Sequence, residues 1–440
     1  MKNKQKLNYP QIFLLGFGFL ASSLCWSIYN AQVPLILDNR FLLSSTLIGV
    51  IMTIDNFFGV IFQPLVGYWS DKTITAYGRR MPWIAIGLPL CSLLFILIPL
   101  QKELKFFMAI IIAFNLIMSL WRSPVIALMP DVTPSPLRSE ANGIINLMGG
   151  LGAILAFLVG GILSDLREDK LYAFVFASIF MLLSLIMLLL FIREPAAISY
   201  RLKKNLPIQN TLANRWAQIS RQQIMLQEKD EKIVEKMERT LHQQEKKSLL
   251  AMLLAIFFWF MGFNAIESFF TIFASKNYAI SGGKASMMLA GFSLAFLLFA
   301  LPAGKIAKKW GRKKTIQIGL FAIIILFLPI LFQVNILLMQ ILLILGGMSW
   351  ALININSLPM VLEFSKEASV GRFTGYYYFF SFSAAITSPI LYGYLQDFLK
   401  TSQYLFAYSL VCFALAFIAM FFVSHGESVD HHVQYIEKSL

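Results

Sequence analysis

The chain has 440 residues, of which 58% are hydrophobic and only 14% are charged. Because soluble domains carry about 25% charged residues, this composition excludes an ordinary soluble globular protein. The formal net charge of +14 would suit a nucleic-acid partner, but the basic residues are distributed as in a membrane protein, so we expect no nucleic-acid partner.

Apolar runs of about 20 residues recur along the whole chain, each long enough to cross a hydrocarbon core of about 30 Å. They are too long and too uniformly apolar for barrel strands, and helices satisfy their own backbone groups in lipid. We therefore predict an all-α membrane protein with twelve transmembrane helices in the lipid bilayer. The expected spans are 11–37, 44–70, 81–100, 105–130, 138–163, 172–192, 248–274, 282–307, 313–332, 335–361, 369–395 and 403–424.

Lysine and arginine gather on one side of the expected membrane. If the N-terminus is cytoplasmic, the inner segments hold 28 of these residues and the outer loops hold 8, with Arg122 inside a span. Without the long central loop the ratio is still 16 to 8. The positive-inside rule therefore predicts that both termini lie in the cytoplasm.

Residues that usually bind metals or drive covalent chemistry are few. Cys25, Cys91 and Cys412 lie within expected spans, and all four histidines lie outside them. Their spacing fits neither a metal site nor a disulfide framework. The sequence also lacks a nucleophile–base constellation and a phosphate-binding loop. It predicts no metal, no cofactor and no enzyme.

The first two spans carry polar groups into the expected bilayer. Trp26 and Asn30 share one face of the first span, which is either an interfacial helix end or part of a substrate cavity. Asp55 lies near the middle of the second span, where an ionised carboxylate costs about 2.5–3.5 kcal/mol unless it faces a cavity or a partner. Asp55 is therefore either half of a structural ion pair or a coupling or substrate residue.

A short polar hinge separates the second span from the third, and a similar hinge follows the eighth span. The first hinge contains Gly67, Asp71, Gly78, Arg79 and Arg80, and the second contains Gly304, Gly311 and Arg312. The second hinge has Lys308 where the first has Asp71, so the two copies differ in charge.

The fourth span presents a polar stripe. Asn115, Ser119 and Arg122 recur at i, i+4 and i+7 on one helix face. Arg122 stays charged and needs an anion, which is either an intramembrane acid or a substrate group. Asp131 follows at the inner end of this span, where it is either a simple cap or a functional acid.

Residues 193–247 form the one long polar stretch. Leu212, Ile219, Leu226 and Ile233 recur every seven residues within it. This spacing predicts an amphipathic helix that lies on the membrane surface or against the inner face of the bundle. The stretch divides the spans into six plus six.

The seventh and tenth spans carry the polar residues of the second half. Asn264 and Glu267 lie on one face of the seventh span, and Glu267 is the second strong acid expected within the bilayer. Trp350, Asn354 and Ser357 share one face of the tenth span.

An internal repeat relates the two halves. Gly143, Gly161 and Asp165 recur as Gly375, Gly393 and Asp397, each 232 residues later. Arg122 and Asn354 are separated by the same interval, so the two polar stripes correspond. We therefore predict two pseudo-symmetric six-helix halves, 1–192 and 248–440, with a binding site near the midplane between them.

Taken together, these features resemble the major facilitator superfamily, including the pattern GxxxD(K/R)…GRR between the second and third spans. Within it, QPLVGYWSD followed by YGRRMPW is similar to the sucrose transporters and to the glycoside–pentoside–hexuronide cation symporters. NINSLPMVLE and TGYYYFFSFSAAITSPILYGYLQD resemble bacterial members of that group. The likeness covers the chain except 193–247.

The resemblance implies a monomeric secondary carrier of the major facilitator fold in the bacterial inner membrane. It also implies that the hinge residues form an inner gating motif, which the missing acid of the second hinge makes asymmetric. Sodium-coupled relatives place a second acid one turn beyond the acid of the second helix. Gly59 stands at that position here, which favours protons over sodium.

We therefore expect proton-coupled symport of a sugar such as a disaccharide or glycoside. A drug or metabolite exporter of the same fold is the alternative, but it would bind through apolar contacts, whereas the polar stripes favour a sugar. The expected proton-coupling residues are Asp55, Glu267 and Asp131. The expected substrate-binding residues are Asn30, Asn115, Arg122, Asn264, Trp350, Asn354 and Ser357.

Overall fold

The computed structural model describes residues 7–134, 137–231, 243–364 and 370–425, and all regular structure within them is helical. Nine helices in these ranges are long and apolar enough to cross a membrane. The shorter apolar helices α4 (Met81–Leu97) and α16 (Leu405–Phe421) and the long helix α15 (Val370–Leu399) occupy three further expected spans. One helix, or two or three consecutive helices, thus stands at each of the twelve predicted spans, which confirms the predicted fold class.

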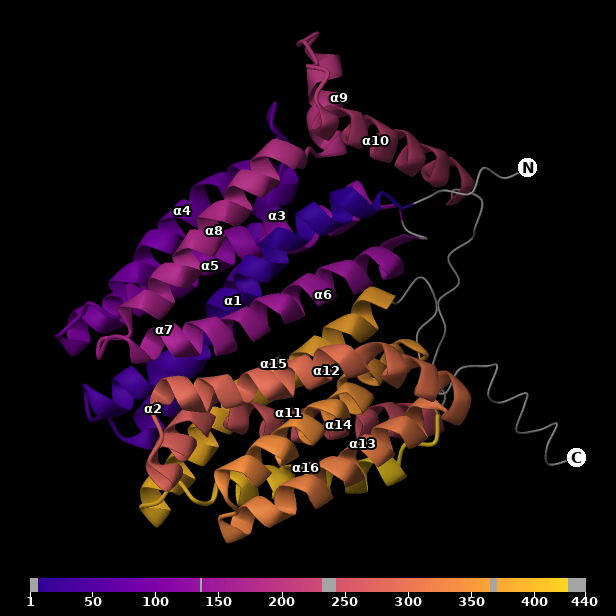
Figure 1. The fold of residues 1–440 in the computed structure, drawn as a ribbon. Coiled ribbons are helices and arrows are strands. Elements are labelled where there is room, and N and C mark those ends of the chain that lie inside the picture. The colour runs from indigo at the N-terminus through magenta and orange to yellow at the C-terminus, as the bar shows by residue number, and fades with distance from the viewer. Residues whose placement is uncertain (1–6, 135–136, 232–242, 365–369, 426–440) are drawn as a thin grey trace, which may run out of the picture. The chain divides into compact units, whose positions relative to one another are not determined.

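The chain divides into two compact units, which are described separately (Figure 1). Unit 1 comprises 1–32 and 54–235, and unit 2 comprises 33–53 and 236–440. Unit 1 contains most of α1 (Tyr9–Asn39), α3 (Ile54–Lys72), α4, α5 (Leu104–Val132), α6 (Arg138–Leu155), η2 (Ala156–Gly160), α7 (Gly161–Asp165), α8 (Leu171–Phe191), α9 (Pro195–Lys203) and α10 (Leu212–Glu231). Unit 2 contains α2 (Ser45–Met52), α11 (Gln243–Tyr278), α12 (Gly282–Trp310), α13 (Arg312–Phe327), η3 (Leu328–Phe332), α14 (Ile336–Leu362), α15 and α16.

Small residues and serine hydroxyls hold the helices of each unit together. In unit 1, a Cβ on Gly87 of α4 would lie 2.6 Å from the Trp121 side chain, so α4 and α5 need a glycine at this contact. Ser184 of α8 donates a hydrogen bond of 2.9 Å to the carbonyl oxygen of Phe17 in α1. In unit 2, Ser409 of α16 donates to the carbonyl of Gly262 in α11 at 3.0 Å. Such contacts stabilise helix pairs in lipid, where apolar surface alone gives no preference for another helix.

The second expected span is not one continuous helix. Its first part, α2, ends at a tight turn around Thr53, whose N–H and hydroxyl both bond to the carbonyl of Val50, at 3.2 and 2.8 Å. The hydroxyl competes for the helical backbone acceptor and ends the regular ladder. The second part, α3, begins directly after the turn and carries Asp55 in its first turn. The break also separates the units, because α2 belongs to unit 2 and α3 to unit 1.

The described part of the central stretch forms α9 and α10, which belong to unit 1, and the start of α11, which belongs to unit 2. The face of α10 that packs inward consists of small residues, Ala213, Ala217 and Ser220, all at most 4% exposed. Leu212 and Ile219 of the seven-residue pattern are instead 49% exposed. The helix therefore docks through the face next to the one that the apolar pattern indicated. The side chain of Leu226 and all of Ile233 lie outside the described residues.

Candidate functional site

The first hinge is a network of charges centred on Arg80, whose side chain is only 5% exposed. Its guanidinium pairs with Asp71 and with Asp131, the latter at 2.9 Å, and donates to the carbonyl of Gly67 at 3.3 Å. Arg79 also pairs with Asp131 and lies 3.8 Å from Asp71. Asp131, at the end of α5, therefore neutralises both hinge cations. We call this set, together with Glu194, the hinge cluster.

Glu194 binds the backbone of the hinge cluster at the start of α4. Its carboxylate is fully buried and accepts hydrogen bonds of 2.8–2.9 Å from the backbone N–H groups of Arg79, Arg80 and Met81, at the start of α4. A carboxylate here is favoured by the helix dipole. Burial raises the pKa of the Glu194 carboxyl above its ordinary value, although the three backbone hydrogen bonds oppose this rise. Gly78 has φ +115°, and a Cβ there would lie 2.3 Å from Glu194 Oε1.

The second hinge contains one ion pair that corresponds to a pair of the hinge cluster. Arg312, at the start of α13, pairs with Glu363, which follows α14, and donates to the carbonyl of Pro359 at 3.4 Å. Gly311 has φ +89°, which explains a glycine there, whereas a Cβ on Gly304 would meet nothing within 4 Å. Gly311 is therefore required by its backbone conformation and Gly304 is not.

A second candidate region in unit 1 surrounds Tyr29. Its ring stacks on Phe114 with centroids 5.7 Å apart and meets the Trp26 ring edge-on at 5.5 Å. Asn115 Nδ2 lies 3.5 Å from the Tyr29 hydroxyl, and the Arg122 guanidinium lies 5.8 Å from the Trp26 ring centroid. We call these five residues the Tyr29 cluster. It joins two predicted site residues, Asn115 and Arg122, to the polar face of α1.

Two polar atoms of the Tyr29 cluster have no hydrogen-bond partner within the described part of the chain: the indole N–H of Trp26 and Oδ1 of Asn115. Asn115 is 1% exposed. By contrast, the hydroxyl of Ser119 on the same stripe bonds to the carbonyl of Asn115, one turn earlier, at 3.1 Å. The cluster thus offers one donor and one acceptor that no other group in the described ranges uses.

The remaining predicted residues of unit 1 lie half-buried on α1 and α3. Asp55 accepts a hydrogen bond of 2.9 Å from Asn56, and it is close enough to Tyr29 to act on it electrostatically. Asn30 is also half-buried. The structure therefore places Asp55 within electrostatic range of Tyr29, whereas Asp131 belongs to the hinge cluster.

In unit 2, the predicted residues lie beside a group of aromatic rings. Trp350 stacks on Phe263, with ring centroids 4.4 Å apart and planes 4° apart, and is only 3% exposed. One face of this indole is therefore covered by protein in this conformation. Ser357 is buried and lies 3.2 Å from the Tyr377 hydroxyl. Asn264 donates to the carbonyl of its own helix at Phe260, while Glu267 and Asn354 are half-buried.

The sequence pattern did not single out Tyr29 and Phe114 of the Tyr29 cluster, Glu194 of the hinge cluster, or Glu363, which pairs with Arg312 in the second hinge. Glu363 could have been found from the repeat, because it lies 232 residues after Asp131, as Arg312 does after Arg80. Tyr29 lies three residues after Trp26, on a neighbouring part of the same helix face. For Glu194 the sequence offered no signal beyond an acid before a proline at the start of α9.

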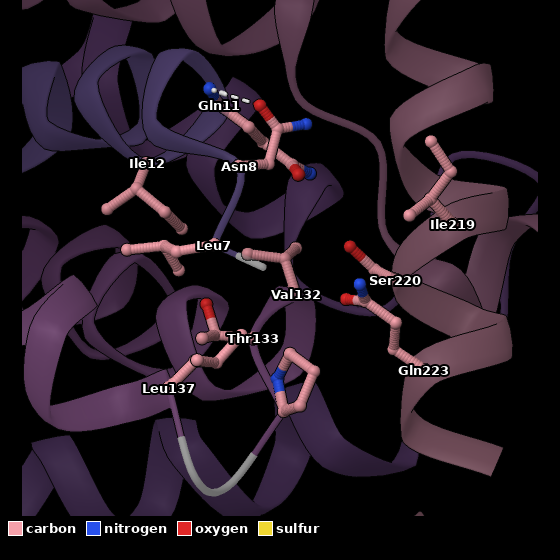
Figure 2. A pocket seen from close by; sticks show the side chains of 11 residues that line it. Leu7, Asn8, Gln11, Ile12, Val132, Thr133, Leu137, Ile219, Ser220 and Gln223 are labelled. Carbon is pink, nitrogen blue, oxygen red and sulfur yellow. Dashed lines mark hydrogen bonds between the residues drawn. The ribbon is translucent and has the colours of Figure 1, made fainter. Parts of the chain in front are cut away.

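A small pocket in unit 1 lies under α10, where the start of α1 meets the end of α5 (Figure 2). Gln11 and Thr133 are each 1% exposed and line it, and Gln11 Nε2 and Thr133 Oγ1 have no protein partner among the described residues. A volume of about 20 Å³ suits one water-sized molecule and excludes a sugar. The pocket is therefore a small polar cavity between α10, the start of α1 and the end of α5, and it is too small to be a substrate site.

Comparison with known proteins gives one family. Residues 15–275 and 252–434 match the family described as Major Facilitator Superfamily. The tetracycline resistance protein, class H, of Pasteurella multocida is 27% identical over 281 residues, covering 62% of this chain and 60% of that protein. The sucrose transport protein SUC3 of Arabidopsis thaliana is 29% identical over 124 residues, covering 23% of this chain and 21% of that protein. The chain therefore matches less than two thirds of the length of either relative.

Solved structures share the fold. A bacterial homologue of the human lysosomal transporter Spinster, in an inward-facing and occupied conformation, superposes with a TM-score of 0.68 at 12% identity. The match covers 96% of this chain and 97% of that one. At 12% identity, this similarity shows a shared fold and does not identify the substrate.

Proposed function

This chain belongs to the Major Facilitator Superfamily, and we propose that it is a proton-coupled sugar symporter that works by alternating access. The family and the all-helical fold are those of secondary transporters, which move solutes across a membrane without an enzymatic reaction. The sugar and the coupling ion are the parts that we propose.

The observation that carries the sugar proposal is the pair of unused polar atoms in the Tyr29 cluster. A buried donor or acceptor without a partner costs about 1–3 kcal/mol, so the cluster favours a ligand that supplies both. A sugar does so through its hydroxyl groups, and its apolar ring face suits the neighbouring aromatic rings. Arg122, at the Trp26 ring, adds a cationic donor for hydroxyl oxygens. An apolar drug would leave these atoms unpaired.

For coupling, we propose that Asp55 binds and releases the proton, with Glu267 as the rival in unit 2. Asp55 lies in the first turn of α3 near Tyr29, and Gly59 replaces the second acid that a sodium site would need. We assign Asp131 to gating, because its carboxylate pairs with both hinge arginines, Arg79 and Arg80. Trp350, Asn354 and Asn264 remain proposed sugar contacts in unit 2.

We also propose the membrane in which the carrier lies, the side of its termini and its oligomeric state. The 28 basic residues of the segments on the N-terminal side, against 8 in the opposite loops, favour cytoplasmic termini in a bacterial inner membrane. We also propose a monomer, as the resemblance to the superfamily implies.

Export of a drug is the second candidate, because a tetracycline resistance protein matches more of this chain than the sucrose transporter does. The two candidates differ in chemistry and in the direction of coupling. An exporter would exchange its solute for protons moving inward, whereas a symporter would take up sugar together with protons.

Uptake by the purified chain in proteoliposomes distinguishes them. We expect a sugar from a panel of disaccharides and glycosides to accumulate only when the outside is more acidic. Exchange of tetracycline against protons, with no sugar flux, would contradict the proposal and support export.

Two variants test the site itself. Asn115→Ala should weaken sugar binding about tenfold, because it removes a buried acceptor. Ser119→Ala is the matched control on the same helix face, since its hydroxyl is already bonded within the helix, and it should leave affinity unchanged. Equal affinity in the wild type and Asn115→Ala would remove the Tyr29 cluster from the site.

A further inference from the structure

Arg193 pairs with no carboxylate among the residues that the structure describes. It follows α8 by two residues and lies over the Tyr77 ring, with the guanidinium carbon 5.8 Å from the ring centroid. One of its terminal nitrogens, Nη1, is buried and has no hydrogen-bond partner within the described ranges. An unpaired buried donor on a charged group is costly, so an acceptor is missing at this position.

A second guanidinium reaches the same loop. Arg201 of α9 donates to the carbonyl of Ala76 at 3.1 Å, next to Tyr77, and to the carbonyl of Pro207 at 2.9 Å. Neither Arg193 nor Arg201 pairs with a carboxylate in the part of the chain that the structure describes. Glu194 is adjacent in sequence, but its oxygens are taken by three backbone N–H groups. Two like charges therefore meet at this loop, and within the described residues neither is paired with an acid.

The position of Arg193 identifies the missing anion. It stands just past the end of the 21-residue apolar helix α8, and hence at the level of the lipid headgroups. Tyr77, 58% exposed, and Trp69, 45% exposed, supply the interfacial aromatic rings typical of this level. Guanidinium groups bind phosphate through paired N–H donors. We infer that Arg193 and Arg201 form a binding site for the phosphate of an anionic lipid headgroup.

Lipid binding to the purified full-length chain tests this site. We expect phosphatidylglycerol in mixed detergent micelles to bind, and Arg193→Gln and Arg201→Gln each to weaken this binding at least fivefold. Arg167→Gln is the control, because Arg167 already pairs with Asp169, at 2.7 Å, and should bind as the wild type does. Arg193→Lys keeps the positive charge but lacks the paired N–H donors of a guanidinium. It should bind the lipid with intermediate strength, which distinguishes the loss of a lipid contact from a loss of folding.

Two further arms identify the source of the phosphate. Phosphatidylcholine carries the same phosphodiester next to a cation and should bind more weakly than phosphatidylglycerol. Inorganic phosphate at millimolar concentration should not displace the lipid. Displacement by inorganic phosphate, or equal lipid binding by the wild type and Arg193→Gln, would overturn the inference.

A separate observation concerns Asp397, at the end of α15. Its two carboxylate oxygens accept hydrogen bonds of 2.8 Å from the N–H groups of Ser45 and Thr46, and one of 2.6 Å from the Thr46 hydroxyl. These groups form the first turn of α2, where the helix dipole favours a negative charge. The backbones of α2 and α15 are also in close contact, since a Cβ on Gly49 would lie 2.2 Å from the carbonyl oxygen of Pro389. Asp397 thus fixes one end of a tight helix crossing within unit 2.

The segment so fixed, 33–53, is joined at both ends to unit 1. Pro34 lies inside α1 at one end, and the break at Thr53 lies at the other. Helices bend at such points, so 33–53 can change its partner without unfolding either unit. Since Asp55 follows Thr53 by two residues, the position of α2 also sets the start of α3. We propose that Asp397 is a positioning residue that holds 33–53 on α15 and releases it during the transport cycle.

Cysteine accessibility tests this proposal without any substrate, so its failure is separable from failure of the sugar proposal. Ile48 of α2 is fully buried, and Ile48→Cys in a chain without its three native cysteines should react slowly with a maleimide. Adding Asp397→Asn should raise the rate threefold to tenfold, because the amide loses the charge that binds the helix start. Asp397→Glu should restore slow labelling in part.

Two controls keep the result specific. Asp169→Asn removes an acid that pairs with Arg167 and should leave the rate unchanged. A chain that retains only Cys91, buried in unit 1, should stay slow with Asp397→Asn. An unchanged rate at Ile48→Cys, or a parallel rise at Cys91, would overturn the positioning role.

Discussion

Arg312 pairs with Glu363 in unit 2, and this pair repeats the one between Arg80 and Asp131 in unit 1. Both residues of the second pair lie 232 residues after those of the first. The repeat therefore preserves the contact between the start of one helix and the end of another. It does not preserve Asp71, and the second pair is more exposed, at 26% and 30%, than the first, at 5% and 11%.

This difference predicts unequal effects of neutralising the two acids. Asp131→Asn removes the more buried of the two carboxylates that pair with Arg79 and Arg80, since Asp71 remains. Breaking a mostly buried pair costs about 3 kcal/mol or more. Glu363→Gln weakens one half-exposed pair and should cost about 1 kcal/mol. Thermal unfolding in detergent should therefore show a clearly larger drop in Tm for Asp131→Asn. Equal drops would mean that the hinge cluster does not act as a unit.

Two hinge glycines should respond oppositely to alanine. Gly78→Ala places a Cβ 2.3 Å from Glu194 Oε1 at a positive φ, and such strain costs about 1–3 kcal/mol. Gly304→Ala adds a Cβ in open space within a helix and should stabilise by up to about 1 kcal/mol. Comparison of the two Tm values with that of the wild type checks this. A stable Gly78→Ala protein would show that the Glu194 cap is dispensable.

The length and apolarity of the runs were enough to predict the helical bundle, because lipid leaves the backbone few alternatives. The break at Thr53 was not predicted. It depends on a hydrogen bond from the Thr53 hydroxyl to the carbonyl of Val50, and a threonine within an apolar run gives no sign of this bond in the sequence. The assignment of 33–53 to unit 2 depends on long-range contacts such as those of Asp397, which no local pattern contains.

The candidate sites show the same limit. The stripe of Asn115 and Arg122 was predicted from helical spacing, and both residues belong to the Tyr29 cluster. Spacing cannot show what lies opposite a side chain. It therefore did not reveal that Phe263 covers one face of Trp350, or that Glu194 closes the hinge cluster from the end of another helix.

The buried Glu194 predicts a pH effect on stability. Burial raises its pKa in the folded state above the value of about 4.3 in the unfolded chain. Protonation therefore favours the folded state, and this contribution is fully present below the unfolded pKa and lost as the pH rises through the folded pKa. The Tm of the wild type relative to Glu194→Gln should rise as the pH falls from 7 toward 4.5. A relative fall over this range would contradict the assignment of the raised pKa to Glu194.

Asp55→Asn is the decisive substitution for proton coupling. Asparagine mimics the protonated acid, so sugar exchange across the membrane should persist, while accumulation driven by a proton gradient should be lost. The reason is that coupling requires a carboxylate whose pKa changes as its surroundings change, and an amide cannot titrate.

Glu267→Gln is the matched variant in unit 2. If Asp55 is the coupling residue, Glu267→Gln should still accumulate sugar against its gradient, although at an altered rate. Both variants are compared in the same proteoliposomes, with counterflow for exchange and an imposed pH difference for accumulation. Gradient-driven accumulation by Asp55→Asn, together with its loss in Glu267→Gln, would move the coupling site to Glu267, because only a group that titrates during the cycle can link proton flow to solute flow.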